Sequence, residues 1–268
     1  MISRSEHIFV ASLIITALST FACGKKKEED EVEYGSLKVQ FANASTAALA
    51  GTAAAPSEFG VKLKYVIAVE DKDGATADTG WNGNNKGNAA KIWANPACSS
   101  VTTSDDGVMV GEIKTDADCA AAGMGYFDLN RDTAAVNTDL NSQNAAVPVG
   151  TYRYIGMAFL GEQQGGNNTY QNIKWAHADS GVTTQEYAKI QVEWTAKFAE
   201  PITISEGQKL TVTLSYDLAA AVTTGLAGAG QEKQAGGGTY QPGRYDDCDS
   251  SLSVCFDVPA FTLSAAAQ

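Results

Sequence analysis

The sequence predicts an all-β protein, an antiparallel β-sandwich of about nine strands with long loop insertions, preceded by a signal peptide and a flexible tether. Three observations favour this class. Apolar and polar residues alternate with a period of two in several segments, as in strands that bury one face. Turn residues separate these segments, and no apolar stripe is sustained at helical spacing. Charged residues are only 19% of the 268 residues, in a Gly-, Ala- and Thr-rich composition typical of exported β domains.

Residues 1–22 predict a secretory signal peptide. Arg4 supplies a positive charge, and an apolar run follows from Ile8 to Ala22. A membrane-spanning helix needs about 20 residues, so this run is too short for a permanent anchor. Its removal takes away Arg4 and Glu6 and leaves the formal net charge at −12.

Cys23 follows the apolar run and opens the segment CGKKKEEDEVE, residues 23–33. This arrangement resembles the lipid-attachment box of bacterial lipoproteins, in which the signal is cut before the cysteine and the cysteine receives the acyl chains. Thr20 departs from the family pattern, where leucine is commonest. The alternative is an ordinary secreted protein cut after Ala22, with Cys23 as a free thiol.

The lipoprotein resemblance implies attachment to a membrane through Cys23. Residues 24–33 then form a charged tether, because they contain too few apolar side chains to pack. Gly24 is not the aspartate that retains lipoproteins at the inner membrane in well-studied envelopes. The resemblance therefore implies the outer membrane, with the periplasmic or surface face left open.

Four further cysteines predict two disulfides, since an even number suits an oxidising compartment. Three pairings are possible. Short separations within turn-rich segments favour Cys98 with Cys119 and Cys248 with Cys255. A four-cysteine zinc site is the weaker alternative, because neither pair has the close spacing of a zinc knuckle.

Residues 34–268 predict one domain, and its first half holds two clear strands. The first is GSLKVQF, residues 35–41. The second is VKLKYVIAVE, residues 61–70, for which alternation places five side chains on one face. These are Val61, Leu63, Tyr65, Ile67 and Val69.

Two insertions, residues 71–106 and 225–243, lack a sustained period and are crowded with turn residues. A short hairpin is expected to include residues 107–113, tied by the first disulfide. The segment 131–146 predicts a polar surface loop with one helical turn.

The second half is more regular. Residues 151–160 are apolar on both faces and predict a central strand. Residues 188–194 alternate, and 201–204 predict an edge strand. In residues 210–216 one face is apolar, and Pro259 limits the last strand to an edge or a bulge. The inward residues of the 210–216 strand are Leu210, Val212, Leu214 and Tyr216.

The order of five segments resembles uncharacterised lipoprotein domains that share a prealbumin-like, or immunoglobulin-like, sandwich. The resemblance covers about half of the mature chain and implies the fold alone, because turn-and-strand motifs recur in unrelated proteins. The segments are GSLKV, VKLKYVIAVED, FDLN, VPVGTYRYIGM and EPITISEGQKLTVTLSYDL.

Composition and motifs narrow the function. An acidic chain without clustered basic residues beyond the tether is not expected to bind nucleic acid. His177 is the only histidine after signal removal, in the run WAHADSG, and is expected in a surface loop. No motif of a hydrolase, a metalloprotease or a nucleotide-binding protein is present.

Two kinds of ligand site are candidates. Asp71, Asp73 and Asp78 surround Gly74 and could supply oxygen ligands to calcium, although Asp-rich turns are common in secreted β proteins. A similar cluster flanks Cys248. Tryptophans in or near loops could stack on a sugar or fill a partner's pocket. The tryptophan candidates are Trp81, Trp93 and Trp175, and the second acidic cluster is Asp246, Asp247 and Asp249.

These observations predict a lipid-anchored envelope protein that acts as a non-catalytic binding, structural or adhesion module. Its expected partners are the membrane, through the lipid, and a glycan or an envelope protein. The alternative is a hydrolase of surface or cell-wall polysaccharide that uses carboxylates such as Asp246 and Asp247.

Overall fold

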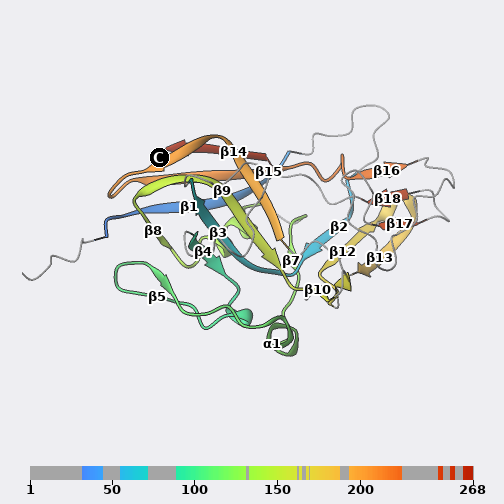
Figure 1. Ribbon diagram of the computed structural model, residues 1–268. Coiled ribbons are helices and arrows are strands. Elements are labelled where there is room, and N and C mark those ends of the chain that lie inside the picture. The colour runs from blue at the N-terminus through green and yellow to red at the C-terminus, as the bar shows by residue number, and fades with distance from the viewer. Residues whose placement is uncertain are drawn as a thin grey trace, which may run out of the picture. The chain divides into compact units, whose positions relative to one another are not determined.

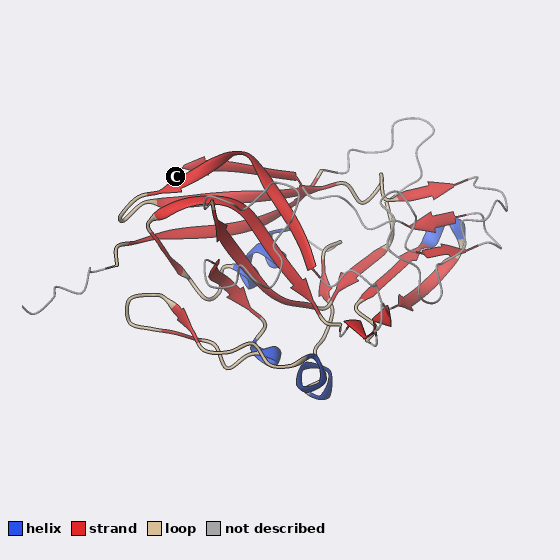
Figure 2. Cartoon of the chain, viewed as in Figure 1, coloured by secondary structure: helices blue, strands red, loops and turns tan. Residues whose placement is uncertain are grey.

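The computed structural model describes the chain from Val32 onward, with gaps. The described residues are mostly in strands, arranged in several sheets that are antiparallel with one exception (Figures 1 and 2). Residues 1–31, which include the whole predicted signal peptide and most of the tether, lie outside this set. The described residues are 32–44, 55–71, 89–130, 133–161, 163–164, 167–168, 170–187, 193–224, 247–249, 254–256 and 262–267.

The first four-stranded sheet has the order β19-β15-β1-β8. Strand β1 pairs in parallel with β15, and the other two pairs are antiparallel. The predicted alternation is confirmed in β1, where every second side chain is buried. In β15 the predicted inward side chains are buried, but Thr211 on the other face is buried as well. The bounds are β1 Tyr34–Asn43, β8 Ala146–Pro148, β15 Lys209–Tyr216 and β19 Thr262–Ala267.

The second four-stranded sheet has the order β14-β9-β3-β4 and is antiparallel throughout. Strand β9 is central and buried on both faces, as the sequence predicts. The predicted edge segment, residues 201–204, forms the end of β14, an edge strand that begins at Glu193. The bounds are β3 Leu63–Glu70, β4 Ala89–Ala94, β9 Gly150–Phe159 and β14 Glu193–Ile204.

One hydrophobic cluster, here called the main core, contains residues from both four-stranded sheets. Burial of this apolar area is the main stabilising contribution to the fold. The cluster includes Val39 and Phe41 of β1, Val66 of β3, Ile155 of β9 and Val212 of β15.

The segment predicted as a single strand over residues 61–70 is two strands. It breaks at Lys62, and the register of β3 with β9 shifts between Leu63 and Tyr65. Such an irregularity reverses which side chains face the core. Leu63 therefore joins the main core, whereas Ile67 and Val69 form a separate small cluster, so the prediction of one shared face is wrong.

A third sheet contains the first of these strands, in the order β13-β12-β2-β7. Its side chains also reach the main core, through Phe59 of β2 and Trp175 of β12. The bounds are β2 Glu58–Val61, β7 Phe127–Asp128, β12 Ile173–His177 and β13 Val182–Tyr187.

The remaining elements are short. Three small sheets pair β5 with β6, β10 with β11, and β18 with both β16 and β17. The described residues also form two short α-helices and two 3₁₀ helices. The bounds are β5 Thr102–Thr103, β6 Met109–Val110, β10 Gln163–Gln164, β11 Asn167–Asn168, β16 Val222–Thr224, β17 Asp247–Asp249, β18 Val254–Phe256, α1 Asp116–Ala121, α2 Thr133–Leu140, η2 Pro96–Cys98 and η3 Ala178–Ser180.

Three sequence expectations differ from this architecture. The insertion at 71–106 contains β4, which pairs with β3. The predicted polar loop at 131–146 contains α2, whose Val136 and Leu140 lie in the main core. The described residues form nineteen strands instead of about nine, because irregular registers divide long segments and many ladders have only two or three residues.

Candidate functional site

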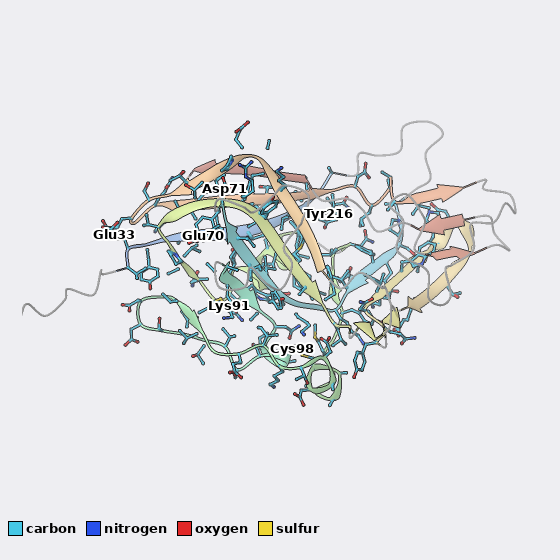
Figure 3. The ribbon with its side chains drawn as sticks, viewed as in Figure 1. Glu33, Glu70, Asp71, Lys91, Cys98 and Tyr216 are labelled. Atoms are coloured by element: carbon cyan, nitrogen blue, oxygen red, sulfur yellow. A yellow bond between two sulfur atoms is a disulfide. The ribbon has the colours of Figure 1, made fainter. Side chains whose placement is uncertain are left out.

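A disulfide-stapled lobe, defined as residues 95–124, projects from the second sheet (Figure 1). The predicted Cys98–Cys119 disulfide is confirmed, and both cysteines are fully buried. It joins η2 to α1 and encloses the β5–β6 hairpin, which also matches the prediction. Figure 3 shows Cys98 close to α1.

Polar contacts fasten the stapled lobe to β3. Lys64 Nζ lies 2.6 Å from Asp116 Oδ1, and both side chains are largely shielded from solvent. Asn95 Nδ2 donates to the carbonyl oxygen of Leu63 at 3.1 Å. The lobe thus depends on a few specific bonds as well as on its disulfide.

Side chains of the α2 segment form a seam between the two four-stranded sheets. Strand β8 pairs with β1 only as far as Ser36. Farther along this edge, Asn137 bonds both backbone groups of Phe41, and Asn141 Nδ2 donates to Val39 oxygen at 2.9 Å. Gln143 bonds both backbone groups of Ala94 in β4. This segment therefore replaces a strand on two edges.

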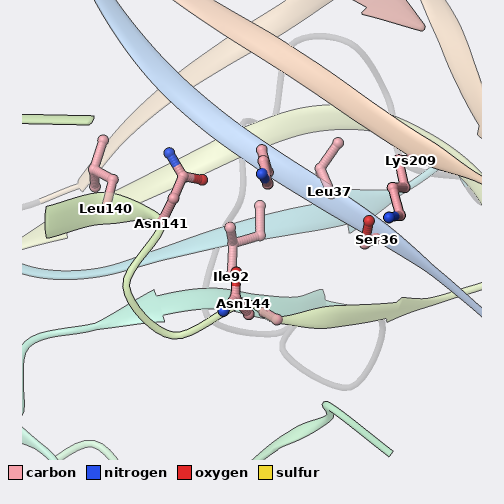
Figure 4. Close-up of a pocket in the computed structure, with 9 residues that line it drawn as sticks. Ser36, Leu37, Ile92, Leu140, Asn141, Asn144 and Lys209 are labelled. Carbon is pink, nitrogen blue, oxygen red and sulfur yellow. The ribbon is translucent and has the colours of Figure 1, made fainter. Parts of the chain in front are cut away.

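A cavity of about 240 Å³ lies in this seam, and its lining includes Ser36 of β1 and the two asparagines that follow α2, Asn141 and Asn144. Figure 4 shows Ser36 and Lys209 on one side of it and Leu140 and Asn141 on the other. Asn144 has a left-handed φ of 45°. Asparagine adopts that conformation readily, and here it turns the chain from α2 toward β8. We call this space the seam cavity.

The seam cavity combines an apolar floor with a basic rim. Leu37, Ile92 and Leu140 line it and are at most 3% exposed. Lys38 and Lys209 line its exposed side. Among the ion pairs between described residues, none includes either of these lysines. Such a lining suits a small molecule with a negative group and an apolar part.

A second polar cluster lies on the third sheet. Lys174 forms an ion pair with Glu58, whose other carboxylate oxygen accepts from Thr184 at 2.8 Å. The hydrogen bond from Lys174, followed by that from Thr184, holds the pKa of Glu58 below its usual range. Lys62 and Lys174 both approach the ring of Tyr126, at 4.8 and 5.1 Å from its centroid. Glu58 thus has two partners within this cluster, Lys174 and Thr184.

The calcium candidates are not brought together among the described residues. Asp71 binds Arg153 through both carboxylate oxygens, each at 3.1 Å. Asp73 and Asp78 lie outside the described residues. Within the described ranges, no group of three or more His, Cys, Asp or Glu side chains could hold a metal ion. Figure 3 shows Asp71 beside Glu70 at the end of β3.

The tryptophan candidates fall into two classes. Trp93 is 4% exposed and Trp175 is fully buried, and both belong to the main core. Trp93 packs against Phe127 with ring centroids 5.9 Å apart. Neither ring presents a face to a ligand, which corrects the expectation for these two residues. Trp81 lies outside the described residues and stays a prediction.

The remaining candidates are placed as follows. His177 ends β12 and is 2% exposed, so the expected surface-loop position is wrong. Strand register places Cys248 directly opposite Cys255 in the β17–β18 pair, and their disulfide stays a prediction. Asp247 and Asp249 lie in β17. Cys23 and Asp246 lie outside the described residues, so lipid attachment and the carboxylate pair of the hydrolase alternative also stay predictions.

The seam cavity could not be predicted from the sequence, because it depends on long-range register. Lys38 and Lys209 occupy outward positions of two alternating strands, a pattern that ordinarily indicates a solvated face. Only the parallel pairing of β1 with β15 makes them neighbours. No local signal in the sequence specifies that pairing.

Comparisons with protein-family models, with curated proteins and with solved structures found no match. None of the helices in the described ranges has the length and hydropathy needed to cross a membrane.

Proposed function

We propose that this chain is a cell-envelope lipoprotein, anchored through Cys23, that holds a non-catalytic β-rich binding module at a membrane surface. The buried Cys98–Cys119 disulfide carries the export part of this proposal. Disulfides persist in oxidising compartments and are rare in the cytosol. This observation supports the interpretation of residues 1–22 as a secretory signal and of Cys23 as the lipidated residue.

The same proposal includes a sandwich arrangement of the two four-stranded sheets, of the kind implied by the prealbumin-like resemblance. Support comes from the main core, which contains buried side chains from strands of both sheets. The α2 seam also bonds an edge of each sheet. A module of this kind presents loops and edges to a partner while its core stays unchanged.

The seam cavity supports a binding role in particular. Ligand sites are concave, with an apolar lining and a few convergent polar groups. The cavity has this composition, whereas two of the three tryptophans proposed for sugar stacking lie in the core. A small-molecule ligand or an envelope protein therefore fits better than a glycan held by those two rings. The outer membrane is the proposed location, on the argument from Gly24.

Metabolic labelling with a clickable fatty acid tests the anchor. The native chain is expected to carry the label and to partition with membranes, and Cys23→Ser is expected to lose both properties, because the acylated thiol is absent. A double variant with Cys98→Ser and Cys119→Ser is the matched control. It loses two other cysteines and should keep the label.

Equal labelling of the native chain and Cys23→Ser would remove the lipoprotein proposal. Absence of label from both would do so as well. In the second case a secreted protein cut after Ala22 becomes the better description, and intact mass of the mature chain would identify that cut.

A further inference from the structure

We propose that the seam cavity binds a small organic anion, with its charged oxygens at Lys38 and Lys209 and its apolar portion on the cavity floor. This inference deepens the proposed binding function and does not depend on the lipid anchor. A carboxylate or a phosphate ester shares the required chemistry, and inorganic phosphate lacks the apolar portion.

The charge of the cavity rim favours an anionic ligand, although the chain has a formal net charge of −12. Lys64, Lys174 and Arg153 each form an ion pair with a described carboxylate. Lys38 and Lys209 enter no ion pair with any carboxylate that the structure describes. Their ammonium groups keep donors that an anionic ligand can use.

The positions of Lys38 and Lys209 on neighbouring strands allow them to bind the same group. Register pairs Ser36 with Lys209 and Lys38 with Thr211. Partners in a parallel pair point to the same face of a sheet, so both lysines share one face. Strand spacing and rise place their Cα atoms about 8 Å apart on a diagonal. Two long side chains at that separation can converge on a single carboxylate or phosphate group.

The floor of the seam cavity is apolar. Leu37, Ile92 and Leu140 border the same cavity and are almost fully buried. An apolar segment of a ligand gains free energy by displacing water from such a surface. Inorganic phosphate would meet only the basic rim. The lining therefore favours an organic anion over a simple one.

The volume of the seam cavity limits the size of the ligand. Cavities that hold drug-sized molecules usually have volumes of about 300–1,000 Å³. The seam cavity, at about 240 Å³, is smaller. A ligand with a single charged group and a few carbon atoms matches it, whereas a long acyl chain or an oligosaccharide does not.

Binding of three probes to the full-length chain tests the proposal. Hexanoate supplies a carboxylate with an apolar tail, inorganic phosphate supplies charge alone, and hexylammonium supplies the same tail with the opposite charge. Ligand-observed NMR titrations in one non-ionic detergent measure each affinity. Hexanoate is expected to bind more tightly than phosphate, and hexylammonium is expected not to bind.

Variants assign the binding to the cavity. Lys38→Gln and Lys209→Gln each remove one ammonium group at an exposed position and should weaken hexanoate binding by about tenfold. Lys197→Gln removes an equal charge from an exposed position on β14, at the edge of the second sheet opposite to β4. That control should leave the affinity unchanged. Ala145→Leu, which fills part of the lining, should weaken hexanoate more than phosphate.

Several results would overturn the proposal. These are no hexanoate binding to the native chain, unchanged binding in both lysine variants, or an equal loss in Lys197→Gln. Phosphate binding as tight as hexanoate binding would remove the role of the apolar floor. Because the labelling experiment is scored separately, failure of the lipid anchor and failure of this ligand site are distinguishable.

Discussion

Among the described residues, thirty buried side chains form the main core, whereas the cluster around the disulfide of the stapled lobe has four, two of them the disulfide cysteines. The two regions also differ in their hydrogen bonding. Strands of eight to twelve residues pair around the main core, while the only strands of the lobe, β5 and β6, have two residues each. The same chain therefore contains one region held by apolar burial and another held by a covalent link and polar contacts.

This difference has a consequence for stability. Regions with few buried apolar contacts open locally at a lower free energy than the core does. A disulfide limits that opening by reducing the conformational freedom of the open state. We therefore expect core substitutions to lower global stability, and lobe substitutions to act mainly on local opening.

The largest expected effect is that of Trp175→Ala in the main core. Trp175 is fully buried, and truncation of a buried aromatic side chain typically costs about 3–5 kcal/mol. The free energy of unfolding from urea titration should fall by that amount over the whole transition. Val110→Ala is the control in the lobe, because Val110 is 48% exposed and should cost less than about 0.5 kcal/mol. Equal costs at the two positions would contradict the division into two regions.

The next effect is that of removing the staple with Cys98→Ala and Cys119→Ala together. The cysteines are 21 residues apart. For a loop of that length, the chain-entropy relation gives a loss of stabilising free energy of about 3 kcal/mol when the disulfide is removed. Hydrogen exchange should accelerate in residues 99–118 and stay slow in β9. Limited proteolysis should cut between the former cysteines first. Uniform acceleration across β9 and the lobe would show that the staple stabilises the whole domain.

The elements that could be predicted from the sequence are those in which the local pattern and the tertiary burial agree. In β1 and β15 a period of two marks the buried face, and the structure buries Leu37 and Val212 as expected. The first disulfide was predictable for a similar reason, because a short separation in a turn-rich segment allows few other partners.

The remaining features depend on contacts that sequence separation hides. An irregular register changes which side chains of β3 face the main core, and no residue near Leu63 indicates this irregularity in the sequence. Helix α2 buries only Val136 and Leu140, too few for a helical stripe to be evident. The seam cavity requires β1, β4, β15 and the turn after α2 together. Its lysines could be recognised only after the parallel pairing was known.

A smaller effect is expected from Asp116→Asn, which breaks the contact between the stapled lobe and β3. The side chains of Lys64 and Asp116 are largely shielded from solvent. The loss of stabilising free energy should therefore be about 1 kcal/mol, the upper end of the range for exposed ion pairs. It should appear as faster hydrogen exchange in α1 with little change in the global unfolding midpoint. Asp105→Asn, at an exposed position in the β5–β6 turn, is the control and should change neither quantity. A global shift in the midpoint would place this ion pair with the core instead.

The smallest effect concerns pH and an ion pair on the third sheet. The pKa of Glu58 is lowered in the folded state, chiefly by the hydrogen bond from Lys174 and next by that from Thr184. A lowered pKa stabilises the fold at pH values above the usual glutamate pKa of about 4.3, and this contribution disappears as pH falls through the lowered folded value. Glu58→Gln should therefore reduce the difference in unfolding free energy between pH 7 and pH 3 by about 0.5 kcal/mol. Glu112→Gln, at an exposed position in the lobe, is the control. Because Glu58 lies in β2, whose Phe59 joins the main core, its loss should shift the global transition and leave exchange in the lobe unchanged. A change confined to the lobe would contradict the assignment of this ion pair to the core region.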